Sequence, residues 1–131
     1  MEKQNFVSLW IGYIKNSSSL NDYVNLKYNE DEGDFLPSQF LIDFDIDIDE
    51  LDEDFIEKVA HEKNCNNLSE LIGGCSYDSV ILPRFENMVG TTLPEQINAA
   101  VLLYNFEYDG REKEINAKNY SFKFIGAVPY V

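Results

Sequence analysis

Residues 7–14 read VSLWIGYI, and this stretch decides the fold. It is rich in branched and aromatic side chains, and the polar run at residues 15–19 ends it. Both features predict a β-strand that belongs to the hydrophobic core. Trp10 lies near the middle of this strand, where a core position is the first expectation and an interface contact the second.

Three other segments also have the pattern of strands. Residues 99–108 are expected to place Leu102, Tyr104, Phe106 and Tyr108 on one face, and residues 120–128 alternate Phe122 and Phe124 with Ser121 and Lys123. A turn at Asp109 and Gly110, followed by a charged loop, joins these two strands. Residues 55–62 fit a strand and, nearly as well, a helix; we favour the strand.

Four short helices are predicted from capping residues and helix-stop signals. Their expected starts are Ser19 before residues 20–24, Ser38 before 39–44, Asn67 before 68–72, and Pro83 in the first turn of a helix that carries Phe85, Met88 and Val89. Gly73, as a left-handed residue, and Gly90 are expected to end the last two.

These elements predict an α+β fold, with residues 1–131 as a single domain. We expect an antiparallel sheet of about four strands with short helices packed on at least one face. The chain shows no secretory leader and no apolar segment that approaches the length of a membrane helix. We therefore expect a cytoplasmic protein with no membrane partner, in which Cys65 and Cys75 are reduced.

Negative charge is concentrated in one part of the chain. Thirteen of the 24 Asp and Glu residues lie between Tyr28 and Glu57, where there is no Lys or Arg, and the formal net charge is −14. Apolar residues are interspersed throughout this region, so it is not a disordered tail, although residues 29–34 are expected to form a loop. Such a surface repels nucleic acid and anionic membranes and attracts cations or a basic partner.

Within this region, Asp occupies every odd position of residues 43–49. If the segment were extended, Phe44, Ile46 and Ile48 would form an apolar face opposite a row of carboxylates. The cap at Ser38 favours helix instead, so the residue pattern leaves both structures open.

The row does not fit an EF-hand calcium loop that begins at Asp43, because Ile48 stands where Gly is required and Asp54 where Glu is required. His61 is the only histidine, and with two cysteines it cannot complete a usual zinc site or a hydrolytic triad. We therefore expect no catalytic residue, no metal site and no cofactor. An enzyme or a divalent-metal protein is the weakest of the functional hypotheses.

Several short motifs together resemble the bacterial immunity protein 22 family. They are residues 7–12 (VSLWIG), residues 33–40 (GDFLPSQF) leading to Asp43 and Phe44, residues 54–57 (DFIE), Ser76 with Tyr77, and residues 103–106 (LYNF). The resemblance spans most of the chain. It implies an α+β protein, encoded beside a polymorphic toxin gene, that binds the toxin domain in the producing cell and blocks it without catalysis.

The leading hypothesis is therefore an immunity protein that neutralises a cognate toxin domain, a basic nuclease, through its acidic surface. We expect a monomer in preference to an oligomer, and no nucleic-acid partner. The alternative is a non-enzymatic acidic mimic of nucleic acid, or an adaptor that binds a basic host protein. The candidate toxin-binding residues are the acidic Asp43, Asp45, Asp47, Asp49, Glu50, Asp52, Glu53 and Asp54, and the aromatic Tyr28, Phe35 and Trp10.

Overall fold

The protein has an α+β fold built on antiparallel strands, seen in a computed structural model that describes residues 2–31 and 33–131. The main sheet has five strands in the order β4-β5-β1-β7-β6, and β2 and β3 form a separate hairpin. The strands are β1 (Glu2–Tyr13), β2 (Lys27–Asn29), β3 (Asp34–Leu36), β4 (Ile56–Cys65), β5 (Ile97–Phe106), β6 (Glu114–Asn116) and β7 (Ser121–Pro129). The helices are α1 (Ser17–Val24), α2 (Gln39–Asp43), α3 (Leu68–Ile72) and α4 (Asp78–Val89), with single 3-10 turns η1 (Ile48–Glu50) and η2 (Glu53–Phe55).

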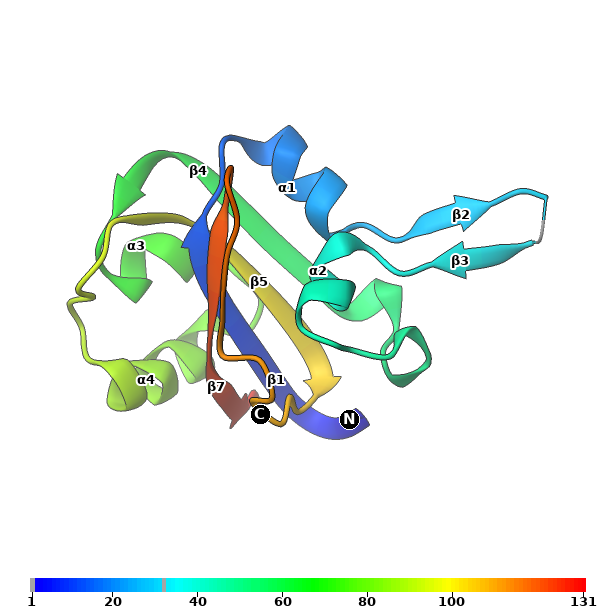
Figure 1. Cartoon of the computed structure of the whole chain (residues 1–131). Helices are drawn as coiled ribbons and strands as arrows, with labels where there is room; N and C mark the ends of the chain where they lie inside the picture. The colour runs from blue at the N-terminus through cyan, green and yellow to red at the C-terminus, as the bar shows by residue number, and fades with distance from the viewer. Residues whose placement is uncertain (1, 32) are drawn as a thin grey trace.

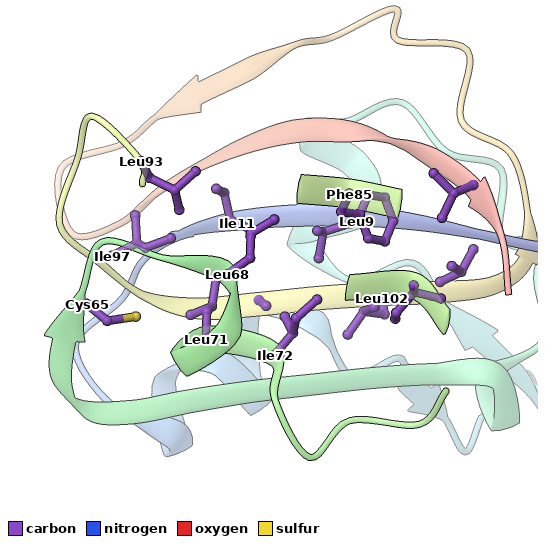
Figure 2. Close-up of a cluster of buried hydrophobic side chains, with 14 of the residues drawn as sticks. Leu9, Ile11, Cys65, Leu68, Leu71, Ile72, Phe85, Leu93, Ile97 and Leu102 are labelled. Atoms are coloured by element: carbon purple, nitrogen blue, oxygen red, sulfur yellow. The ribbon is translucent and has the colours of Figure 1, made fainter. Parts of the chain in front are cut away.

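Helices cover both faces of the sheet, with α3 and α4 on one side and α1 and α2 on the other (Figure 1). The first face carries an aliphatic core around Leu9, Ile11 and Phe85 (Figure 2). The second carries an aromatic core around Trp10 and Phe40. Because β1 is the central strand and both its faces are covered, residues 7–12 are buried throughout, which explains the unbroken apolar run in the sequence.

The four predicted strands are confirmed, including the strand at residues 55–62, which is β4. The short edge strand β6 and the β2–β3 hairpin were not predicted. Residues 29–34 were expected to be loop. Asn29 and Asp34 instead belong to the strands of the hairpin, whereas residues 30, 31 and 33 form the turn between them as expected. Glu32 lies outside the described residues.

One predicted alternation is wrong, because β5 changes face near its end. Tyr104 packs in the aliphatic core, whereas Phe106 and Tyr108 pack in the aromatic core. Asn105 between them has a left-handed φ of 58°, and the β1–β5 register shifts at this point. At this irregularity residues 3–6 of β1 lie opposite Asn105 alone, and the side-chain alternation of β5 is reversed beyond it.

Two helix starts and one helix end also differ from the predictions. Helix α1 is capped by Asn16, whose side chain accepts the Ser19 N–H at 2.8 Å, so Ser19 lies inside the first turn. Pro83 lies in the interior of α4, because Ile81 and Phe85 extend its fully buried face on both sides of the proline and burial outweighs the cost of the missing N–H. The left-handed residue after α3 is Gly74 (φ 94°), one position later than predicted.

The other predicted helix signals are confirmed. Asn67 caps α3 through the Glu70 N–H at 2.8 Å, Ser38 caps α2 through the Leu41 N–H at 3.3 Å, and Gly90 ends α4 with a φ of 86°. The extended form of residues 43–49 is wrong. The chain leaves α2 at Asp43 and then forms η1 and η2 on its way into β4.

Candidate protein-binding groove

The acidic segment, residues 43–54, is folded by its own aspartates. Asp47 Oδ1 accepts the Asp49 N–H at 2.9 Å and caps η1, and Asp52 Oδ1 accepts the Asp54 N–H at 2.9 Å and caps η2. Aspartate stabilises such turns because its short side chain reaches the backbone two residues ahead. Two aspartates of the segment, Asp47 and Asp52, are therefore consecutive caps.

Asp43, which is only partly buried, serves a structural purpose. Its Oδ2 accepts the hydroxyls of Tyr23 and Tyr120, each at 2.9 Å, and its Oδ1 accepts the Gln39 amide at 2.8 Å. Burial, and then the hydrogen bond to Asp43, raise the pKa of Tyr23 well above its usual value and that of Tyr120 to about 12. These bonds tie α1, α2 and the loop before β7 together.

Asp45 has a left-handed backbone (φ 53°) and forms an ion pair with Arg111, which also pairs with Asp109 at 2.9 Å. The guanidinium thus neutralises part of the acidic segment on that side. The eight acidic candidates therefore divide into Asp43 and Asp45, which bind groups of this chain, and a group from Asp47 to Asp54 around η1 and η2.

A groove of about 910 Å³ runs between the β2–β3 hairpin and residues 48–54. Five of the eight acidic candidate residues line it, together with aliphatic side chains and Phe35. None of its lining residues is Lys or Arg. Apart from Glu2, the acidic lining residues all lie on η1 and η2 or the link between them. The lining residues are Glu2, Leu26, Phe35, Leu36, Ile48, Asp49, Glu50, Leu51, Asp52, Glu53 and Asp54.

The hairpin projects from the body of the molecule (Figure 1). Its residues Phe35 and Leu36 line one side of the groove. Tyr28 and Phe35 are direct cross-strand partners on it, with ring centroids 5.3 Å apart. Their exposed fractions are 56% and 54%, although side chains of this type are usually well buried. An exposed aromatic pair beside apolar side chains is typical of a protein contact surface.

Trp10 is not part of this surface. It is fully buried, with its ring centroid 5.1 Å from those of both Phe40 and Phe124. Its position in the central strand places it beneath α2, so it has no surface to offer a partner, and the expectation that it contacts one is wrong. The core expectation for Trp10 is confirmed.

The sequence prediction missed the apolar part of the groove, Leu26, Leu36, Ile48 and Leu51. A signal for the hairpin was present, because two short segments with an aromatic residue at their centre flank a polar run that contains Gly33. Gly33 has a left-handed φ of 71°, a backbone that glycine adopts without steric cost.

Two kinds of feature are absent from residues 2–31 and 33–131. No helix there combines the length and the apolar character needed to cross a membrane. In the same ranges, no three His, Cys, Asp or Glu side chains converge so that they could hold a metal ion.

Comparison with known proteins identifies a family. Residues 7–130 match the family described as Immunity protein 22, which covers nearly the whole chain. The chain belongs to the Immunity protein 22 family. No curated protein and no solved structure matches it. The matched region includes the whole of the groove except Glu2, so every other groove residue is part of the family domain.

Proposed function

We propose that this member of the Immunity protein 22 family neutralises a toxin domain by seating its groove on a basic surface of that domain. Membership of the family supports an immunity function and, with it, a toxin partner. The observation that carries the finer proposal is the composition of the groove, in which carboxylates of η1 and η2 face the exposed Phe35 and Leu36 of the hairpin.

Charge complementarity is the first physical reason. Toxin domains that cleave nucleic acid need a basic cleft to hold phosphates. A surface with five carboxylates on residues 49–54 and no basic lining residue would be attracted to such a cleft and would compete with its substrate. The proposed partner is therefore a basic nuclease domain.

The hairpin supplies the second reason. Surface charges mainly steer association, whereas aromatic and aliphatic side chains at the centre of an interface contribute most of the binding free energy. Phe35 and Leu36 line the groove and are exposed, and Tyr28 lies beside Phe35. We assign these three side chains as anchors and the carboxylates of η1 and η2 as steering groups.

This mode of action needs only binding. We place the protein as a monomer in the cytoplasm of the cell that makes the toxin, with no catalytic residue, cofactor or metal. Its acidic character supports a protein partner and opposes binding to nucleic acid, because phosphates and the groove carry the same charge.

The test is capture followed by a toxicity assay. The full chain is used as bait in lysate of the producing strain, and each retained protein is then expressed in a host, alone and together with the chain. We expect one retained protein that is toxic alone and harmless with the chain. Toxicity that persists in the presence of the chain would contradict the proposal, and a retained basic host protein without toxicity would support the adaptor alternative.

A further inference from the structure

A second, smaller pocket lies at the start of β4, next to the groove. Its volume is about 290 Å³, and it is lined by Asp54 and Phe55 of η2, Ile56 and Glu57 of β4, Ser76 and Tyr77 before α4, and Tyr104 of β5. Asp54 also lines the groove, so the two hollows are adjacent. We call this hollow the Glu57 pocket.

The Glu57 carboxylate is held in place on one side only. Its Oε1 accepts the Tyr104 hydroxyl at 2.9 Å and the Ser76 N–H at 3.0 Å, whereas its Oε2 has only a 3.4 Å contact with the same N–H. A carboxylate has about four acceptor positions, so acceptor capacity remains at Oε2. Among the residues that the structure describes, no Lys or Arg forms an ion pair with Glu57.

Aromatic side chains border this carboxylate. Phe55 and Tyr77 are both about half exposed, and the Tyr77 ring lies 6.0 Å from that of Tyr104 and 4.7 Å from that of Tyr130. The pocket therefore combines an oriented carboxylate with exposed ring faces, the combination that recognises a cationic side chain.

The backbone of Tyr77 is unusual at this point. It is left-handed, with a φ of 61°, at the residue that precedes α4, and its side chain makes no capping hydrogen bond to the helix. A non-glycine residue with this backbone conformation is strained. This backbone conformation gives α4 no side-chain cap. It places the half-exposed Tyr77 ring at the edge of the pocket.

We propose that the Glu57 pocket receives an arginine side chain of the toxin domain, whose guanidinium pairs with Glu57 and stacks on Tyr77 and Phe55. This inference rests on the proposed function and deepens it. Arginine fits better than lysine because its planar guanidinium both stacks on rings and donates in a fork to carboxylate oxygens. Asp54 at the pocket edge adds a second negative charge.

The test uses the isolated chain and a small probe. Amide NMR spectra are recorded during titration with N-acetyl-arginine methylamide, and with the corresponding citrulline compound, which has the same shape without the charge. We expect saturable shifts at Ser76 and Tyr77 with the arginine probe, and binding about ten-fold weaker with citrulline, because citrulline cannot form the charge-assisted hydrogen bond. Equal binding of the two probes, or no saturable shift, would overturn the proposal.

Two variants localise the effect. Glu57→Gln keeps the acceptor for Tyr104 and Ser76 but removes the charge, and Tyr77→Gly removes the ring where glycine accepts the backbone conformation. Each is expected to weaken arginine binding about ten-fold, because each removes one charge-assisted or cation–π interaction with the guanidinium. The control, Glu62→Gln, changes an exposed carboxylate further along β4 and should leave binding unchanged.

The outcome is separable from that of the toxicity assay. If the probe fails to bind while the chain still neutralises a toxin, the pocket assignment is wrong and the proposed function stands. If the probe binds at Glu57 but no toxin is neutralised, the proposed function is wrong.

Discussion

The rings of Tyr28 and Phe35 lie 5.3 Å apart on opposite strands of the β2–β3 hairpin, and each side chain is more than half exposed. The two rings meet edge to face, a favourable arrangement for an aromatic pair. The hairpin thus presents an exposed aromatic pair beside the acidic groove.

Truncation of these rings should affect binding more than stability. We expect Phe35→Ala to weaken binding of the captured toxin domain by about 2 kcal/mol, as for an anchor residue, with a smaller loss for Tyr28→Ala. The melting temperature should change little, because both rings are largely exposed. Binding is measured by calorimetric titration of each variant. The control is Tyr13→Ala, which removes an exposed ring outside the groove. Equal effects at Tyr13 and Phe35 would exclude the hairpin as an anchor.

Asp43 should matter for stability and not for binding. In Asp43→Ala the hydroxyls of Tyr23 and Tyr120 lose their shared acceptor, at a cost of about 2 kcal/mol in the free energy of unfolding. Asp43→Asn retains an acceptor oxygen and should lose less. Urea denaturation measures both, and a stable alanine variant would show that these bonds contribute little.

Stability should also fall at alkaline pH through the same cluster. Tyr120 ionises near pH 10.0 when unfolded, and burial followed by the Asp43 hydrogen bond raises its folded pKa to about 12. The contribution of a raised pKa is complete below the unfolded value, so the free energy of unfolding should fall as pH rises from 10 to 12. Tyr120→Phe should show a shallower fall over this range in urea denaturation, and an unchanged slope would contradict this assignment.

The buried indole of Trp10 gives a third stability prediction. Its Nε1 is buried and, among the described residues, has no hydrogen-bond partner. Trp10→Ala should cost about 4 kcal/mol because it leaves a large cavity. Trp10→Phe should cost much less, since a ring remains in the core and the unsatisfied indole donor is removed. Similar losses in the two variants, measured by thermal unfolding, would indicate that the indole N–H is satisfied by the surrounding rings.

The four long strands and the four α-helices could be predicted because they follow local signals. The run at residues 7–14, the alternation at residues 120–128 and the caps at Ser38 and Asn67 are all written within a few neighbouring residues. The face change at Asn105 could not, since it depends on pairing with a distant part of β1. Pro83 was misplaced because burial of Ile81 and Phe85, a tertiary effect, outweighs its local preference.

The candidate site was predicted only in part for the same reason. Charge density identified residues 49–54, but the sequence could not show that Asp43 and Asp45 bind Tyr23, Tyr120 and Arg111, all distant along the chain. The apolar side of the groove arises where the hairpin approaches η1 and η2.

The most direct test of the central claim compares two triple charge reversals. Asp49, Glu53 and Asp54 line the groove, and reversing them to Lys preserves the capping residues Asp47 and Asp52. The control reverses Glu62, Glu95 and Glu112, three exposed residues outside the groove, and changes the net charge equally.

Association with the captured toxin domain is then followed by stopped flow at low and high salt. The groove variant should associate on the order of ten-fold more slowly at low salt and lose most of its salt dependence, while the control stays close to the wild-type protein. Equal slowing of both variants would mean that only total charge matters, and would contradict the assignment of this groove as the binding surface.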